Sequence, residues 1–261
     1  MSTLYLHDFG RAAYGPVLDL QMAVLQRVLA GHSLPRAWLL LVEHDPPVIT
    51  LGRRGRESDF QISREALLGR GFEIHEASRG GEVTTHGPGQ LVGYPIIQLD
   101  RDGGQTVRGY VRNLEETVIQ LLGKFGISAG RVKGFTGVWV GDEKVAAIGV
   151  AVRRWTTYHG FAINVCNDLS AYDLFVPCGI TDKGVTSVSK LLGRSVSVEE
   201  IKPLLIECFA EVFSFDKISR ADDLSPEWKK EIERRCREID EGTVALSSAE
   251  DVFERAYARL S

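Results

Sequence analysis

Cys178 is the side chain in this sequence best suited to nucleophilic chemistry. It stands between Pro177 and Gly179, in a stretch (167–184) without hydrophobic periodicity, which favours a presented side chain over a packed one. A thiolate attacks carbonyl carbon well, but a cysteine becomes reactive only beside a group that lowers its pKa. Most cysteines are small buried hydrophobic residues. We expect that packing role for the other three, which are Cys166, Cys208 and Cys236.

Lys144 could supply the activating charge. It follows the turn 141–143 and begins the apolar run VAAIGVAV. A lysine beside a turn is usually solvated, but one at the rim of an apolar groove can have its pKa lowered and can stabilise a thiolate. Small residues recur nearby at Gly149, Gly160 and Ala162. They predict either tight sheet packing or a slot for an extended apolar ligand.

The segment RGGEVTTHGPGQ (79–90) is typical of a binding loop. Its four glycines let the backbone approach a ligand where a Cβ would clash, and its arginine, threonines and histidine add polar groups. A strand-like run (91–98) follows directly, so we expect a loop mounted on a sheet. The segment matches neither of the phosphate-binding patterns G-x-x-x-x-G-K-[ST] and G-x-G-x-x-G.

Two histidines, His86 and His159, lie nearest to these motifs. A Cys–His dyad therefore stays open as an alternative way to activate Cys178. The chain has neither an H-E-x-x-H nor a C-x-x-C pattern, so we expect no metal site and no disulfide framework.

Hydrophobic periodicity predicts a mixed α/β core up to about residue 195 and a helical tail after it. We expect strands at 3–6, 38–42, 48–51, 72–77, 91–98, 137–140, 144–152 and 158–165. We expect helices at 17–30, 63–70, 106–125, 201–212, 225–239 and 249–260. Ser197 and Glu200 form a capping-box pattern, whereas Pro203 predicts a ragged start to the helix that follows.

Composition is that of a globular protein of one large core or two smaller ones, with 44% hydrophobic and 25% charged residues among 261. No apolar run approaches the roughly 18 residues that span a membrane. The N-terminal residues MSTLYLHDFG lack the order of a secretory signal, so we expect a cytoplasmic protein. A net charge of −4 argues against nonspecific nucleic-acid binding.

Basic residues are concentrated in two short stretches. Arg53, Arg54 and Arg56 lie in GRRGR, and Arg153 and Arg154 follow a predicted strand. These stretches are either solvated turns or a docking patch for an acidic partner.

Four motifs in order give the chain a clear resemblance. R-G-G-x-x-T-x-H-G-P-G-Q (79–90), K-x-x-A-I-G (144–149), H-G-F-A-x-N (159–164) and P-C-G-I (177–180) resemble those of the lipoyl(octanoyl) transferases. The resemblance covers about residues 1–220, which it marks as an octanoyltransferase catalytic domain. Residues 221–261 run past the usual end of the family and are expected to form a helical C-terminal extension.

The resemblance implies a fold and a set of site residues. The fold is an α/β (α+β) mixed sheet with flanking helices, as in the lipoate and biotin protein ligases. Cys178 would be the acyl-thioester nucleophile, and Lys144 would lower its pKa. Substrate contacts are implied for Arg79, Gly80, Gly81, Glu82, Val83, Thr84, Thr85, His86, Ala147, Ile148, Gly149, Gly160, Phe161 and Ala162.

The implied reaction is transfer of an octanoyl group from octanoyl-acyl carrier protein to a lysine of a lipoyl domain, through an acyl-cysteine, in protein lipoylation. The implied acceptors are the lipoyl domains of 2-oxoacid dehydrogenases and the glycine cleavage H protein, with no cofactor, nucleic acid or membrane involved. An ATP-dependent lipoate or biotin protein ligase is the main alternative, because it would share the fold and the glycine loop. A non-enzymatic acyl-binding or scaffold protein is the third.

Overall fold

The computed structural model describes residues 2–31, 37–175 and 183–220. Cys178, Cys236 and the proposed extension 221–261 lie outside the described residues, and so do the helices expected at 225–239 and 249–260. No helix among the described residues is long and apolar enough to cross a membrane.

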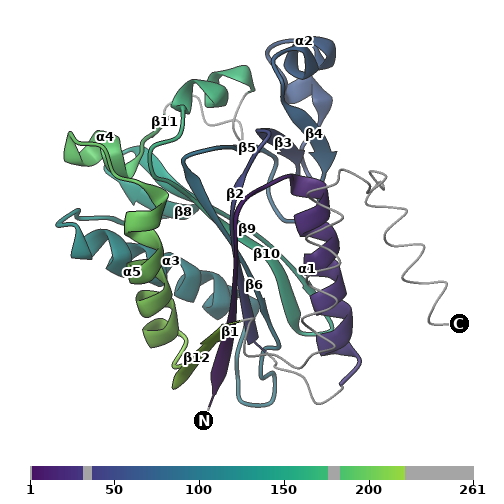
Figure 1. Ribbon diagram of the computed structural model, residues 1–261, viewed down its shortest axis with the longest axis vertical. Helices are drawn as coiled ribbons and strands as arrows, with labels where there is room; N and C mark the ends of the chain where they lie inside the picture. The colour runs from purple at the N-terminus through teal and green to yellow at the C-terminus, as the bar shows by residue number, and fades with distance from the viewer. Residues whose placement is uncertain (1, 32–36, 176–182, 221–261) are drawn as a thin grey trace, which may run out of the picture.

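A large mixed sheet forms the centre of the fold (Figure 1), which confirms the predicted fold class. Its strand order is β12-β1-β2-β6-β10-β9-β8-β7, and β11 pairs with β9. The strands are β1 (Thr3–Ala12), β2 (Ala37–His44), β6 (Gln90–Ile97), β7 (Gly130–Val132), β8 (Phe135–Val140), β9 (Glu143–Arg153), β10 (Thr156–Asn164), β11 (Gly184–Val185) and β12 (Lys217–Arg220). The pairs β1–β12, β1–β2 and β9–β11 are parallel and the others antiparallel.

Helices cover both faces of this sheet (Figure 1). α1 (Tyr14–Leu29) packs an apolar stripe on one face, in a core with the sheet residues Trp38 and Leu40. α3 (Val107–Lys124) and α5 (Val198–Val212) cover the other face in a separate core, and the short α4 (Val188–Leu192) lies beside them. Burying two sheet faces this way supplies the main driving force for folding.

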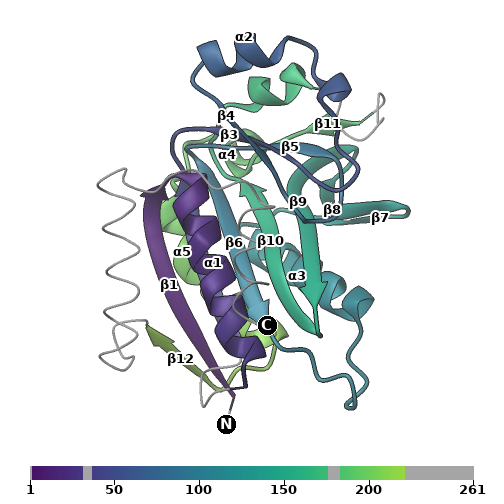
Figure 2. The ribbon, with the colours of Figure 1, turned by 90° about the vertical axis from the view of Figure 1, so that its right-hand side faces the viewer.

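A second, three-stranded sheet lies above the large one (Figure 2). Its order is β4 (Glu73–Glu76), β3 (Val48–Leu51) and β5 (Val83–His86). A small core joins it to α2 (Arg64–Gly69) and to the 3-10 segment η2 (Leu169–Leu174), and a further 3-10 turn, η1 (Glu57–Asp59), follows β3. The sheet matters because β5 belongs to the glycine-rich segment.

The predicted elements are largely confirmed, with a few corrections. Ser197 caps α5 as expected, but the predicted capping box is incomplete, because the Glu200 carboxylate pairs with Arg194. Ser63 caps α2. Pro203 does not make the start of α5 ragged. A proline disturbs the carbonyl four residues before it, which here belongs to Glu199 in the first turn of the helix. Only one helical residue precedes Glu199, so there is almost no helix for the proline to displace. Cys208 is buried as predicted, whereas Cys166 is exposed and not packed.

His44, the last residue of β2, is a buried histidine with both ring nitrogens satisfied. Its Nδ1 lies 3.2 Å from the carbonyl oxygen of Ala12, so Nδ1–H is the donor there. Nε2 is then the acceptor for the Tyr94 hydroxyl at 2.7 Å. Burial, and secondarily the neighbouring His86, lowers the pKa of His44 to about 3. The ring is therefore neutral in the folded protein at neutral pH.

Acid is expected to destabilise the fold through His44. Between the unfolded pKa of about 6.5 and the folded value of about 3, only the unfolded chain binds this proton, so the free energy of unfolding falls as pH is lowered. His44→Gln should reduce the slope of that free energy by up to about 1.4 kcal/mol per pH unit. Urea unfolding of the wild type and of His44→Gln between pH 5 and 6.5 measures the slope of the unfolding free energy against pH for each protein. Equal slopes in the two proteins would contradict the assignment.

Candidate active site

The glycine-rich segment is held against both sheets by its backbone. The amide of Gly80 donates to the carbonyl of Val150 on β9 at 2.9 Å, and the amide of Gly52 donates to the carbonyl of Glu82 at 2.8 Å. A Cβ at Gly52 would lie 2.6 Å from the Gly81 carbonyl oxygen, and a Cβ at Gly149 would lie 3.0 Å from Arg79 Cδ. The close approach therefore requires glycine at position 52, just after β3, and favours glycine at position 149 on β9.

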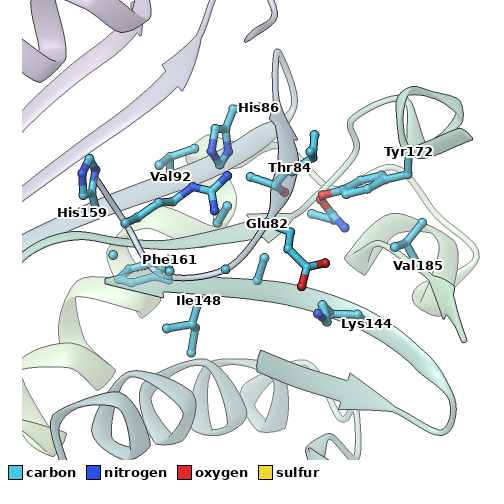
Figure 3. A pocket seen from close by; sticks show the side chains of 18 of the residues that line it. Glu82, Thr84, His86, Val92, Lys144, Ile148, His159, Phe161, Tyr172 and Val185 are labelled. Carbon is cyan, nitrogen blue, oxygen red and sulfur yellow. The ribbon is translucent and has the colours of Figure 1, made fainter. Parts of the chain in front are cut away.

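Beneath this segment lies a cavity of about 120 Å³ (Figure 3). It brings together most of the residues predicted for substrate contact. These are Arg79, Gly80, Gly81, Glu82, Val83, Thr84, His86, Ala147, Ile148, Gly149, Gly160, Phe161 and Ala162. Lys144 lines it as well. Thr85 does not line it, because its side chain is buried and its hydroxyl donates to the carbonyl of Val48.

The middle of the cavity is apolar. Val92, Ile148, Phe161 and Ala162 line it from three neighbouring strands, β6, β9 and β10. A Cβ at Gly93 would lie 2.3 Å from the Phe161 ring, so only a glycine at this position leaves space for the ring. Walls of this kind suit an alkyl chain, which gains free energy by leaving water.

Lys144 lies at one end of the cavity, with His159 at the other (Figure 3). Its Nζ is 4.8 Å from the centre of the Trp139 ring, a cation–π contact. Lys183 also lies over that ring, at 5.7 Å, and pairs with Asp142 at 2.6 Å. Phe175 and Lys183, the described residues on either side of the segment that holds Cys178, both line the cavity.

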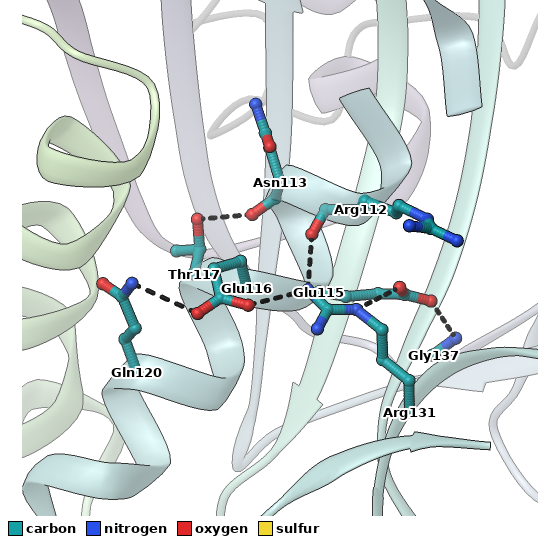
Figure 4. Close-up of polar contacts among 8 residues, drawn as sticks. All are labelled: Arg112, Asn113, Glu115, Glu116, Thr117, Gln120, Arg131 and Gly137. Atoms are coloured by element: carbon teal, nitrogen blue, oxygen red, sulfur yellow. Dashed lines mark hydrogen bonds and ion pairs between the residues drawn. The ribbon is translucent and has the colours of Figure 1, made fainter. Parts of the chain in front are cut away.

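A polar cluster on α3 supports the strand opposite Lys144 (Figure 4). The buried carboxylate of Glu115 accepts from the backbone N–H of Gly137 at 3.2 Å and from Arg131 Nε at 2.9 Å. The β8–β9 register shifts just beyond this point, between Val138 and Trp139. Glu115 thus anchors the strand irregularity that places the Trp139 ring beneath Lys144.

His86 belongs to a hydrogen-bonded network on the cavity wall. Gln90 Nε2 donates to Asn164 Oδ1 and to the Tyr172 hydroxyl, so its Oε1 is the acceptor for His86 Nδ1–H at 2.7 Å. Nε2 is then the unprotonated nitrogen of this histidine. Burial lowers the pKa of His86 to about 4, against the opposing effect of the Gln90 hydrogen bond. Among the described residues, no three His, Cys, Asp or Glu side chains are grouped to hold a metal.

Arg79 is a buried cation that lines the cavity. Its Nη2 donates to the carbonyl and the hydroxyl of Thr50, each at 2.7 Å, and its Nη1 donates to the carbonyl of Gly80 at 3.1 Å. After burial itself, its charge is the next cause of the low pKa of His159, which lies at about 3. The histidines around the cavity are consequently neutral at neutral pH.

Several lining residues were not predicted from the sequence. Tyr14, Tyr94, Trp139, Tyr172, Phe175 and Lys183 reach the cavity from six different elements or connections. Aromatic residues on predicted strands and helices carry no signal that separates a cavity wall from a core. Asn164, another lining residue, did have such a signal, because it ends a motif that contributes other lining residues. Gln90, which bonds to His86 and Asn164 without lining the cavity, had the same signal.

Comparison with known proteins identifies the family. A model of the lipoyl protein ligase A/B catalytic domain matches residues 14–210. A separate model, described as a putative addiction module component, matches residues 213–252, most of which lie outside the described residues. The division of the chain at residue 220 stays a prediction.

Curated relatives and solved structures agree with that family. The octanoyltransferase of Solibacter usitatus is 44% identical, over 85% of this chain and 98% of its own length. That of Koribacter versatilis is 49% identical, over 79% of this chain and 82% of its own length. One of Myxococcus xanthus is 42% identical over 84% of this chain, which spans 62% of that relative.

Among structures, the putative lipoate protein ligase Ta0514 of T. acidophilum is 18% identical, with a TM-score of 0.71 over 95% of this chain and 97% of its own. A lipoate-protein ligase A bound with ATP is 17% identical, with a TM-score of 0.65 over 91% and 93%. At such low sequence identity, both structures show the fold alone. The family model and the relatives show more: this chain is an acyltransferase of the octanoyltransferase family, built on the lipoyl protein ligase A/B catalytic domain.

Proposed function

We propose that this protein transfers an octanoyl group from octanoyl-acyl carrier protein to a lysine of a lipoyl domain, through an octanoyl-Cys178 intermediate. One observation carries the proposal. All the predicted contact residues except Thr85 line one cavity with an apolar middle. Lys144 lines it too, and so do Phe175 and Lys183, which flank residues 176–182 in the sequence. The names of the relatives support octanoyl as the transferred group.

In the first step the Cys178 thiolate attacks the carbonyl carbon of the donor thioester. A new carbon–sulfur bond forms as the bond to phosphopantetheine breaks, and the departing thiolate takes a proton. In the second step the ε-amine of the acceptor lysine attacks the octanoyl-cysteine, forms the amide and regenerates the thiol. Splitting the transfer lets two bulky protein partners visit the site in turn. Thioester exchange is nearly isoenergetic and amide formation is downhill, so no ATP is required.

Lys144 would act on both steps. Its positive charge favours the thiolate of Cys178 over the thiol, which is the ordinary effect of a nearby opposite charge on a pKa. At the end of the first step it would give its proton to the departing phosphopantetheine thiolate. In the second step its amine, now neutral, would accept the proton that the attacking lysine loses. The cation–π contact with Trp139 fixes the direction of the lysine side chain without neutralising its charge.

The apolar walls would hold the alkyl chain. Each buried methylene contributes about 0.8 kcal/mol, so an octanoyl tail gains on the order of 5 kcal/mol. An additional carbon would then change binding only about fourfold. Discrimination against longer chains must therefore come from a steric limit inside the cavity.

A covalent intermediate is the most direct consequence. Incubation with octanoyl-acyl carrier protein should add the mass of one octanoyl group to the intact protein, and Cys178→Ala should abolish that gain. Cys166→Ala is the matched control, because Cys166 is exposed but does not line the cavity. An adduct that persists in Cys178→Ala would overturn the assignment of Cys178 as the nucleophile. Octanoylation of a lipoyl domain that requires ATP and free octanoate would favour the ligase alternative.

The pH dependence of acylation distinguishes lysine from histidine as the activating group. Removing the charge in Lys144→Met should raise the apparent pKa of the acylation rate and slow it by about 10²–10⁴-fold at neutral pH. In His86→Gln the midpoint should stay at the wild-type value, even where the rate falls, because a ring of pKa about 4 does not titrate in that range. Stopped-flow acylation from pH 5 to 9 measures both. A shifted midpoint in His86→Gln alone would support the Cys–His dyad.

Charge reversal tests partner docking. The backbone amides of Arg53 and Arg54 donate to the carbonyls of Arg79 and Gly81, so this exposed basic turn lies on the roof of the cavity. Arg53→Glu should lower the association rate with an acidic carrier protein and weaken its salt dependence. Arg108→Glu, an exposed residue of α3, is the control. Unchanged kinetics in Arg53→Glu would leave these arginines as solvated surface.

A further inference from the structure

His159 has a backbone conformation that is unusual for its position. It lies inside β10, is 2% exposed, and has φ of 55°, in the left-handed region that non-glycine residues rarely adopt. The β6–β10 pairs Phe161↔Gly93 and Thr156↔Gln98 share one register, which places Pro95 opposite His159. Because proline has no N–H to donate, the strand pairing is interrupted there and β10 can kink.

Two polar contacts hold His159 in this conformation. Its backbone N–H donates to Oε1 of Gln21, a fully buried residue of α1. Its ring Nε2 lies 3.1 Å from the Ser78 hydroxyl, next to the glycine-rich segment. A left-handed residue persists in a folded protein only where its surroundings over-determine it, and such residues gather at functional sites.

The kink directs the ring into the cavity, at the end opposite Lys144 (Figure 3). The imidazole lies beside the rings of Tyr94 and Tyr158, with centroids 6.5 and 5.0 Å away. Burial, and after it the charge of Arg79, lowers the pKa of His159 to about 3. A neutral ring of this kind can border an alkyl chain without placing a charge against it.

The spacing along β9 matches the length of an octanoyl chain. His159 pairs with Val150, and the lining residues Ala147, Ile148 and Gly149 precede Val150 directly on β9. Lys144 lies three residues before Ala147 on the same strand. From Ala147 to Val150 the strand advances three residues, which span about 10 Å, with three backbone bonds per residue. An extended octanoyl thioester has eight bonds from sulfur to methyl carbon and so spans about 9 Å by the same rise per bond. Two further carbons would add roughly 2 Å and meet the ring.

We propose that His159 is the end wall of the acyl cavity and the residue that limits the transferred chain to about eight carbons. This inference rests on the proposed function and names the specificity determinant of the same site. Its geometric basis is the kink opposite Pro95, the contacts to Gln21 and Ser78, and the three-residue stretch of β9 from Ala147 to Val150, the partner of His159.

The test compares octanoyl, decanoyl and dodecanoyl donors. His159→Gly removes the ring, and glycine adopts the left-handed backbone conformation without strain. His159→Asn also removes the ring, and asparagine adopts this conformation more readily than most residues with a Cβ. Ser214→Gly is the matched control, because Ser214 has φ of 57° and does not line this cavity. Transfer rates to a lipoyl domain are measured for the full-length proteins, with circular dichroism to verify folding.

Both His159 variants should raise the ratio of decanoyl to octanoyl transfer roughly tenfold over wild type, because two more methylenes can then be buried. The Ser214→Gly ratio should equal that of wild type. A ratio within twofold of wild type in a folded His159 variant overturns the end-wall assignment. Absence of octanoyl transfer by wild type overturns the proposed function instead.

In that case calorimetry of free octanoate and decanoate binding tests whether His159 is the end wall. An affinity ratio that is unchanged in the His159 variants refutes this assignment.

Discussion

The site depends on one backbone contact, the hydrogen bond from the Gly80 amide to the Val150 carbonyl. It ties the glycine-rich segment to the large sheet, while the amide of Gly52 ties the same segment to the small one. A Cβ at Gly52 would force the segment away from β3, and one at Gly149 would crowd Arg79 and the Gly80 carbonyl. The cavity therefore exists because three backbones approach more closely than residues with a Cβ allow.

This arrangement separates the electrostatic functions along one slot. A cation fixed over Trp139 stands at one end, an apolar wall forms the middle, and a neutral His159 closes the other end. The charge needed for thiolate chemistry is thus kept away from the place where an alkyl tail would be buried. Glu115 contributes from outside the cavity, through its hydrogen bond to Gly137 in the strand beneath Lys144 (Figure 4).

Sequence patterns predicted the elements whose signal is local. The apolar stripe of α3, the hairpin that carries Lys144 and the glycine-rich segment could all be predicted from periodicity and composition. β5 could not, because its four residues lie among turn-forming glycines and are stabilised by pairing with β3, a contact far away in sequence. For the same reason, nothing local indicated that Thr85 turns away from the cavity.

The least predictable feature is the role of His159. Its conformation follows from Pro95 on a neighbouring strand and Gln21 on α1, neither of which is near it in sequence. Local patterns report which residues share a face of a strand, but they assume that the strand is regular. A kink imposed by a distant proline breaks that assumption, and the direction of the side chain then depends on tertiary structure.

A crystal structure of the octanoyl-enzyme tests the central claim most directly. The account predicts electron density for an alkyl chain that runs from Cys178, past Lys144, between Gly80 and Ile148, with its methyl end at His159. Density for the chain elsewhere, such as the separate hollow between β1 and α3 that is lined by Tyr5 and Tyr110, would contradict it.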